Sequence, residues 1–117
     1  MKALWLPYVV GDLTTARDFY TVRLGLSEVD RWLNDRERGT VLHAAGDAFV
    51  ELVEPAERSP RSRPPPLAFE VDAASTVDGY AARLAAQRPP HRYPRGHYGF
   101  ETPGPAGATI MVWSELP

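Results

Sequence analysis

The chain of 117 residues carries one short pattern twice, about sixty residues apart. The segment "FYTVRLG" at 19–25 returns as "GYAARLA" at 79–85, and both copies contain Tyr-x-x-Arg-Leu. The longer segments "VGDLTTARDFYTVRL" and "VDAASTVDGYAARL" also share a Val, an acidic residue and a Thr-containing helix start. Such self-similarity predicts a duplicated structural unit. The fold is therefore expected to consist of two similar halves.

In the first half, the apolar run "KALWLPYVV" predicts a strand, and the segment "TTARDFYTVRL" places Ala16, Phe19, Tyr20 and Leu24 at helical spacing. Asp12 or Thr14 is suited to begin this helix and Gly25 to end it. Branched and aromatic runs bounded by turn residues predict strands. Three such strands follow the helix, at 27–33, 39–45 and 48–54.

The second half repeats this order. A strand is predicted at 66–72 and a helix at 75–86, with Ser75 as N-cap and Asp78 as its capping-box partner. Weaker and stronger strand candidates follow at 91–94, 97–102 and 108–113. The Pro-rich stretch at 56–65 separates module one (1–55) from module two (66–117), because prolines sustain neither a helix nor a central strand.

Two β-α-β-β-β modules, each with one amphipathic helix, predict an α+β fold in a single domain. We expect a curved mixed sheet with a concave pocket and the helices on the outer face. Residues pointing into the pocket are then every second one along each strand. A few positions therefore decide whether the pocket holds a metal, an organic ligand or another chain.

Composition narrows the function classes. There are no cysteines, which excludes disulfides, thiolate metal sites and Cys nucleophiles. The formal charge of −2 argues against nucleic-acid binding. No segment resembles a membrane span or a signal peptide, so we expect no membrane partner and a cytoplasmic location. The only basic cluster, Arg58, Arg61 and Arg63, is most simply a solvated part of the linker.

The motif order resembles the vicinal oxygen chelate superfamily, which includes glyoxalases, bleomycin resistance proteins and extradiol dioxygenases. The carrying segments are "VGDLTTARDFYTVRLGL" at 10–26, "VELVEP" at 50–55, "AFEVDA" at 68–73 and "ETPGPAGATIMVW" at 101–113. The last is similar to the family's turn before its final strand. This resemblance covers essentially the whole chain and implies the fold, not one activity.

The resemblance also implies where a metal would bind. The family's metal-dependent enzymes use four ligands on the inner strand faces, usually His, Glu, His and Glu. Matched by the motifs, these positions fall on Trp5, Glu51, Pro66 and Met111. A divalent ion needs three or four nitrogen or oxygen donors, and only Glu51 offers one. We therefore expect no metal and no other cofactor.

The replacements favour an apolar pocket suited to a flat aromatic molecule. Ordinary core packing is the alternative role for its aromatic members. The resemblance favours the pocket and is closest in character to the metal-free drug-binding members. The expected ligand-binding residues are Trp5, Trp32, Phe49, Glu51, Met111 and Trp113. The leading hypothesis is sequestration of a small aromatic natural product or drug, of the antibiotic-resistance type, by a homodimer; the dimer rests on the resemblance alone.

Two other functions stay open. Glu51 could pair with an arginine, bind a cationic amine, or act as general base in a cofactor-free isomerase or lyase, with His43 or Tyr98 as partner. A metal-dependent enzyme would need unusual ligands such as His43, Glu51 and His97. The histidines, His91 included, lack His-x-x-x-His spacing and are expected mainly at the surface.

Overall fold

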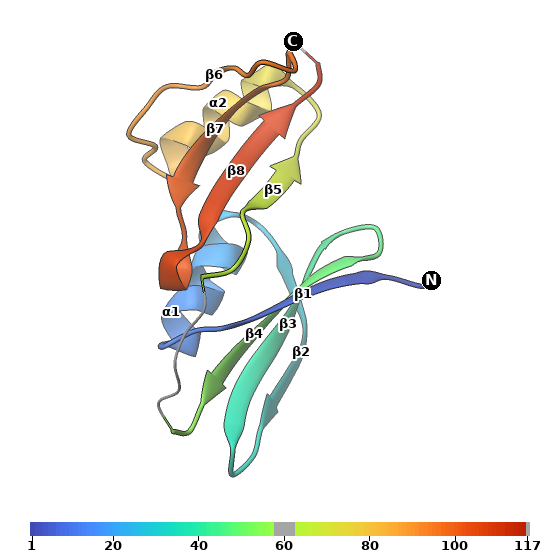
Figure 1. The fold of residues 1–117 in the computed structure, drawn as a ribbon, viewed down its shortest axis with the longest axis vertical. Coiled ribbons are helices and arrows are strands. Elements are labelled where there is room, and N and C mark those ends of the chain that lie inside the picture. The colour runs from blue at the N-terminus through green and yellow to red at the C-terminus, as the bar shows by residue number, and fades with distance from the viewer. Residues whose placement is uncertain (58–62, 117) are drawn as a thin grey trace. The chain divides into compact units, whose positions relative to one another are not determined.

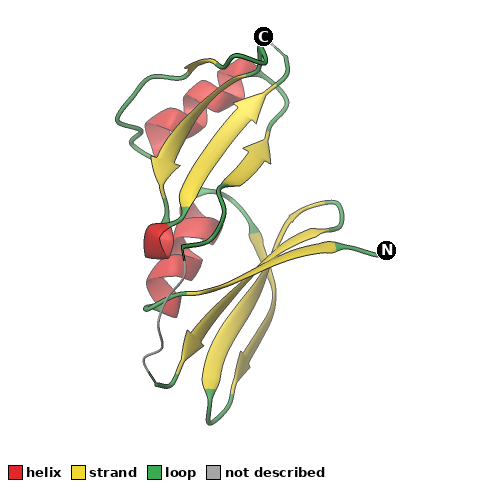
Figure 2. Cartoon of the chain, in the orientation of Figure 1, coloured by secondary structure: helices red, strands yellow, loops and turns green. Residues whose placement is uncertain are grey.

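Each half of the sequence forms its own four-stranded sheet with one helix (Figures 1 and 2). The computed structural model describes residues 1–57 and 63–116. It divides into two units, Met1–Pro64 and Pro65–Pro117. The predicted linker at 56–65 lies partly outside the described residues. Arg58 and Arg61 are among the residues that lie outside, and Arg63 is exposed.

The first unit follows the predicted order. Its elements are β1 (Leu4–Val9), α1 (Leu13–Asp18), a π-helical turn (Phe19–Arg23), β2 (Ser27–Leu33), β3 (Glu37–Ala45) and β4 (Ala48–Pro55). The strand order is β1-β4-β3-β2, in which β1 runs parallel to β4 and the other pairs are antiparallel. These four strands are called sheet A below.

The second unit repeats this arrangement. Its elements are β5 (Leu67–Glu70), α2 (Ala74–Arg83), β6 (His91–Arg92), β7 (Tyr98–Pro103), a short 3₁₀ turn (Pro105–Gly107) and β8 (Thr109–Ser114). Sheet B has the order β5-β8-β7-β6, and β5 is parallel to β8 just as β1 is to β4. The predicted α+β class with two repeated modules is confirmed.

Helix α1 covers one face of sheet A because alternate strand residues on that face are apolar. Leu13, Ala16, Tyr20 and Leu24 supply the helical side of this core. The strand side is supplied by Tyr8, Leu42, Val50 and Leu52, all buried. The Tyr8 and Tyr20 hydroxyl oxygens lie 2.6 Å apart in a hydrogen bond. Burial raises the pKa of both tyrosines, so the pair stays neutral.

The two helices begin differently. Asp12 caps α1, accepting hydrogen bonds from the Thr15 amide (3.1 Å) and hydroxyl (2.9 Å), and Gly25 follows its π-helical end with φ +88°. The prediction of Ser75 as N-cap is wrong. Helix α2 begins at Ala74 because the Ala73 carbonyl already accepts from the Thr76 and Val77 amides.

Asp78 likewise does not act in a capping box. Its carboxylate accepts a hydrogen bond of 2.6 Å from the Tyr98 hydroxyl, which ties α2 to β7. The carboxylate raises the pKa of Tyr98. Within the described residues, no helix is long and apolar enough to cross a membrane.

We predict that Tyr20→Phe destabilises the chain by about 1–3 kcal/mol, because the buried Tyr8 hydroxyl then lacks its partner. Urea denaturation followed by circular dichroism measures this loss. The double variant Tyr8→Phe/Tyr20→Phe should recover part of it, since no hydroxyl is left unpaired. A Tyr20→Phe protein as stable as the parent would contradict the assigned role of the pair.

Candidate functional site

The second face of sheet A points away from α1 and carries all four predicted ligand-binding residues of the first unit. Strand register places its residues in cross-strand rows. One row holds Trp5, Phe49 and His43; the next holds Pro7, Glu51, Val41 and Asp30; the third holds Val9, Val53, Gly39 and Trp32. These eleven residues are called face A below.

Three rings from neighbouring strands form a ladder on face A. The Trp5 and Phe49 rings stack with centroids 4.9 Å apart at 28°, and His43 lies 5.4 Å from Phe49 on the other side. Trp5 is nevertheless 47% exposed. Phe49 therefore supports the indole on one side and leaves aromatic surface accessible for a further ring.

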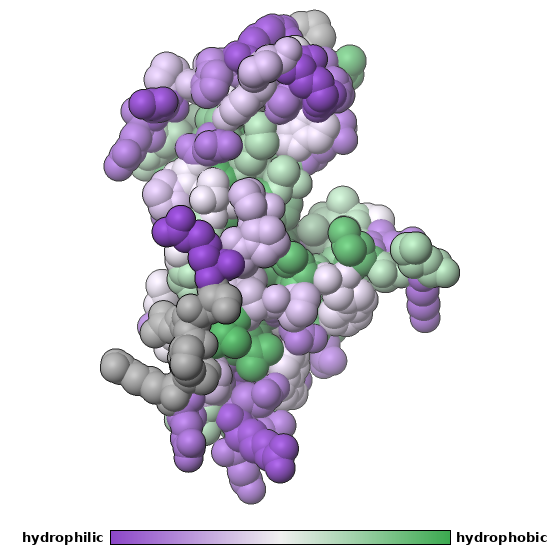
Figure 3. Space-filling view, viewed as in Figure 1, coloured by the Kyte–Doolittle hydropathy of each residue, from purple (hydrophilic) through white to green (hydrophobic). Residues whose placement is uncertain are grey.

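The start of β1 and the β3–β4 hairpin run side by side, joined by a hydrogen bond of 2.7 Å from the Leu4 amide to the Asp47 carbonyl. Hydrophobic atoms are visible over this segment in the space-filling view (Figure 3). Leu4, the neighbour of Trp5 on the opposite side of β1, is 74% exposed. Leu4 is thus an accessible apolar residue next to the ladder in sequence but not part of face A.

Trp32 lies at the other end of face A and is fixed by two contacts. Its indole Nε1 donates to a Glu37 carboxylate oxygen at 2.9 Å, and its ring occupies the space above Gly39. A β-carbon at position 39 would overlap the ring. Gly39 is therefore required for its lack of a side chain, so that the indole can lie against the sheet.

Glu51 occupies the middle row between these aromatic groups. Phe49 and Val53 flank it on β4, and Pro7 and Val41 are its cross-strand partners. It is partly buried and has no hydrogen bond or ion pair among the described residues. Its carboxylate is thus available to accept a hydrogen bond from a ligand.

The corresponding face of sheet B contains the other two predicted residues, Met111 and Trp113, both partly buried. The Trp113 ring meets His97 edge-on at 5.2 Å, and His97 stacks on Tyr93 at 4.8 Å. His97 Nδ1 is buried without a hydrogen-bond partner among the described residues. Arg95 lies 5.2 Å above the Trp113 ring and pairs with Glu115.

Tyr98 does not belong to either aromatic face, because its hydroxyl bonds to Asp78 on α2. The role of Tyr98 as a partner for Glu51 stays a prediction. His43 does share face A with Glu51, but its Nε2 lies 2.8 Å from the Gly46 carbonyl. His91 is exposed, and its ring lies tilted against Tyr93 with centroids 4.5 Å apart.

The model of the Glyoxalase/Bleomycin resistance protein/Dioxygenase superfamily matches residues 3–112. The chain belongs to this superfamily. No curated protein matches significantly. Among solved structures, a superfamily member from Sphaerobacter thermophilus has a TM-score of 0.76 at 21% identity, with 98% of each chain covered.

Two other similar structures carry more specific names. A lactoylglutathione lyase from Agrobacterium tumefaciens has a TM-score of 0.70 at 23% identity, covering 96% of this chain and 92% of its own. An antibiotic binding protein from Streptomyces has a TM-score of 0.73 at 21% identity, covering 97% and 95%. At these identities the similarity shows the fold alone, which here is shared by an enzyme and a binding protein.

The residues do not fit the metal that many members of this superfamily hold. Of the four matched positions, Trp5, Pro66 and Met111 supply no nitrogen or oxygen donor from their side chains, which leaves Glu51. Within 1–57 and 63–116, no group of three His, Cys, Asp or Glu side chains is placed to hold an ion. One carboxylate cannot replace the water around a divalent cation.

We predict that Gly39→Ala displaces the Trp32 indole and costs about 1–3 kcal/mol, as overpacked sites do. Loss of the shifted indole N–H resonance in an NMR spectrum reports the broken bond to Glu37, and thermal unfolding reports the stability. Gly79→Ala on α2 is the matched control, because nothing lies within 4 Å of a β-carbon there. It should stabilise the helix by about 0.5–1 kcal/mol. Unchanged Trp32 resonances in Gly39→Ala would refute the steric role.

Proposed function

We propose that this chain binds a planar aromatic small molecule on face A and sequesters it without chemical conversion. The observation that carries the proposal is the Trp5–Phe49 stack, in which a supported indole remains 47% exposed. A ring already held by its neighbour loses little freedom when a ligand stacks on it, which lowers the entropic cost of binding.

The energetics favour an aromatic ligand. Each aromatic pair contributes about 0.5–1.5 kcal/mol beyond the burial of its area. Trp5 supplies the accessible platform, while Trp32 lies at the opposite end of the same face, held by Glu37 and Gly39. Val9 and Val53, which are partly buried, add apolar surface between them. Several such contacts together support a micromolar dissociation constant, which corresponds to a binding free energy of about −8 kcal/mol.

The side chains at the four matched metal positions favour ligand binding over metal-dependent chemistry, because only Glu51 supplies an oxygen donor. The superfamily fold occurs both in a lactoylglutathione lyase and in an antibiotic binding protein. Trp5 stands at a position where the family's metal-dependent enzymes have a metal-binding side chain, and it offers a π-surface instead of a nitrogen or oxygen donor. These replacements support the binding role, and an antibiotic or a similar aromatic natural product is the proposed ligand class.

The test is a calorimetric titration with a panel of planar aromatic antibiotics and polyketide-like compounds in the presence of a chelator. We expect saturable binding at micromolar concentration or below by at least one compound. Trp5→Ala should weaken it about ten-fold or more, about 1.4 kcal/mol. Leu4→Ala is the matched control, because Leu4 is an exposed apolar neighbour on the opposite side of β1.

Three outcomes would count against sequestration. Absence of saturable binding across the panel would remove the proposed ligand class. Equal weakening by Trp5→Ala and Leu4→Ala would indicate nonspecific apolar contact rather than a site on face A. Turnover of a bound compound that is lost in Glu51→Gln, with affinity retained, would assign the chain to cofactor-free catalysis with Glu51 as base.

The homodimer remains a prediction. Size-exclusion chromatography with light scattering should give about twice the chain mass of 13.0 kDa. A mass of one chain at micromolar protein, with aromatic binding intact, would show that a single chain suffices for the site.

A further inference from the structure

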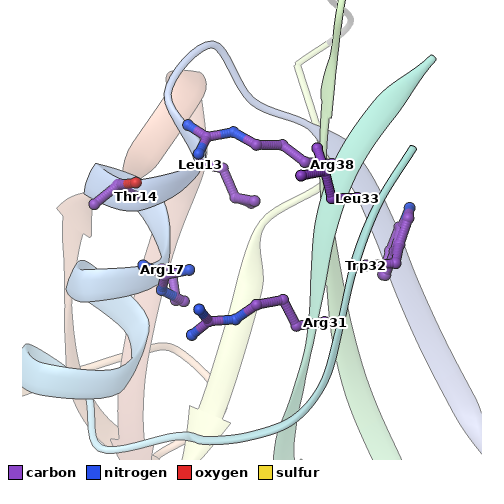
Figure 4. A pocket seen from close by; sticks show the side chains of 7 residues that line it. All are labelled: Leu13, Thr14, Arg17, Arg31, Trp32, Leu33 and Arg38. Carbon is purple, nitrogen blue, oxygen red and sulfur yellow. The ribbon is translucent and has the colours of Figure 1, made fainter. Parts of the chain in front are cut away.

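A groove lies on the other side of sheet A, between the start of α1 and strands β2 and β3 (Figure 4). Its volume is about 460 Å³, within the size range of small-molecule sites. Three arginines on three elements line it, Arg17 on α1, Arg31 on β2 and Arg38 on β3. The ring of Trp32 points away from the helix, to the opposite side of the sheet (Figure 4).

A β-bulge creates this lining. The pairing of β2 with β3 shifts between Glu28 and Asp30, so the strict alternation of β2 is interrupted. As a result Glu28 and Arg31, three residues apart, both lie on the helix side, while Trp32 lies on face A. Without the bulge, Glu28 and Arg31 would point to opposite faces.

Two of the arginines are held by carboxylates. Arg31 binds both oxygens of Glu28, at 2.6 and 3.2 Å. Arg38 binds both oxygens of Glu54, at 2.7 and 3.1 Å, and Glu54 also accepts from the Leu13 amide at 2.8 Å. A guanidinium has five N–H donors, so each retains donors after its bidentate pair is made. The carboxylates thus fix the orientation of Arg31 and Arg38.

Arg17 is different, because its guanidinium has no hydrogen bond or ion pair with any described side chain. It extends toward the guanidinium of Arg31 (Figure 4). Arg17 is close enough to Glu28 to help lower the pKa of its carboxyl group. That carboxylate is already bound to Arg31, and it accepts a hydrogen bond of 2.5 Å from the Thr40 hydroxyl. Asp12, near Arg38, is occupied in capping α1. The positive guanidiniums of Arg17 and Arg31 therefore lie toward each other, and the carboxylate near them, that of Glu28, is already hydrogen-bonded to Arg31 and Thr40.

The groove also contains apolar surface. Leu13 is buried at its base, and Leu33 at the end of β2 is 79% exposed. A ligand that neutralises the guanidiniums and covers Leu33 would satisfy both features. Arg31 and Arg38 each have a carboxylate partner, whereas Arg17 has none among the described residues, so an added negative charge is best placed beside the Arg17 guanidinium.

We propose that this groove binds a small amphipathic carboxylate, whose anionic group lies between Arg17 and Arg31 and whose apolar body covers Leu33. Carboxylates match the fork of a guanidinium in geometry and charge. This site is on the opposite side of sheet A from face A. It is therefore independent of the aromatic ligand proposed above.

The test compares 2-naphthoate with its neutral amide, 2-naphthamide, by calorimetry and by NMR chemical-shift mapping. We expect 2-naphthoate to bind at least about ten-fold more tightly than the amide, with shifts centred on Leu13 and Leu33. Arg17→Gln should abolish that preference. Raising the salt concentration from about 50 mM to about 500 mM should weaken the binding of 2-naphthoate but not that of 2-naphthamide, because salt screens exposed charges.

The matched control is Arg23→Gln, which removes the same charge from the π-helical turn outside the groove. It should change the affinity for 2-naphthoate less than two-fold, and Trp5→Ala should leave it unchanged. Circular dichroism checks that each variant is folded. Equal binding of acid and amide, undiminished binding by Arg17→Gln, or loss of binding in Trp5→Ala would overturn the proposal, as would no binding by the parent protein.

Discussion

The parallel pairing of β1 with β4 fixes most of what the first unit presents to its surroundings. It joins the beginning of the module to its end and sets Trp5 beside Phe49 and Pro7 beside Glu51. Because side chains alternate along both strands, a shift of one residue would exchange the two faces. Tyr8 would then lose its buried partner Tyr20, and Trp5 would turn toward the helix. Core packing and the aromatic ladder therefore depend on the same register.

Only one face of sheet A is covered by α1, and this asymmetry separates structure from candidate function. The apolar residues that pack beneath α1 are almost fully buried, including Leu42 and Leu52 at 0% exposure. The aromatic residues of face A are partly or clearly exposed. An aromatic side chain covers more area when buried than most aliphatic ones, so its exposure here is a notable feature of this face. Stability thus comes mainly from the helix side, which leaves face A free to vary with the ligand.

Local sequence determined much of the fold in advance. Strand β2 spans the predicted residues 27–33, since Gly25 and Asn34 form turns on either side. Asp12 caps α1 as one of the two predicted candidates. Ser75 failed as a cap because a backbone carbonyl, that of Ala73, took the first helical hydrogen bonds. Any residue provides such a carbonyl, so no side-chain pattern could reveal it.

The candidate sites were less accessible to sequence reasoning because they depend on pairing between strands. Trp5, Phe49 and Glu51 follow from alternation along β1 and β4, and the structure places them together on face A. The contact of His43 with the Phe49 ring and the position of Trp32 over Gly39 require the register of β3 against both neighbours. Sequence alone does not fix that register.

The bulge in β2 shows how one extra residue gives the two sides of sheet A different chemistry. Strict alternation along 27–33 would group Glu28 with Trp32 and oppose both to Arg31. The shift at Val29 instead brings Glu28 and Arg31 together beside α1 and sends Trp32 to face A. The charged groove and the full extent of the aromatic face therefore have one common cause. A single irregularity in the ladder allows one thin sheet to present guanidinium groups on one side and an indole on the other.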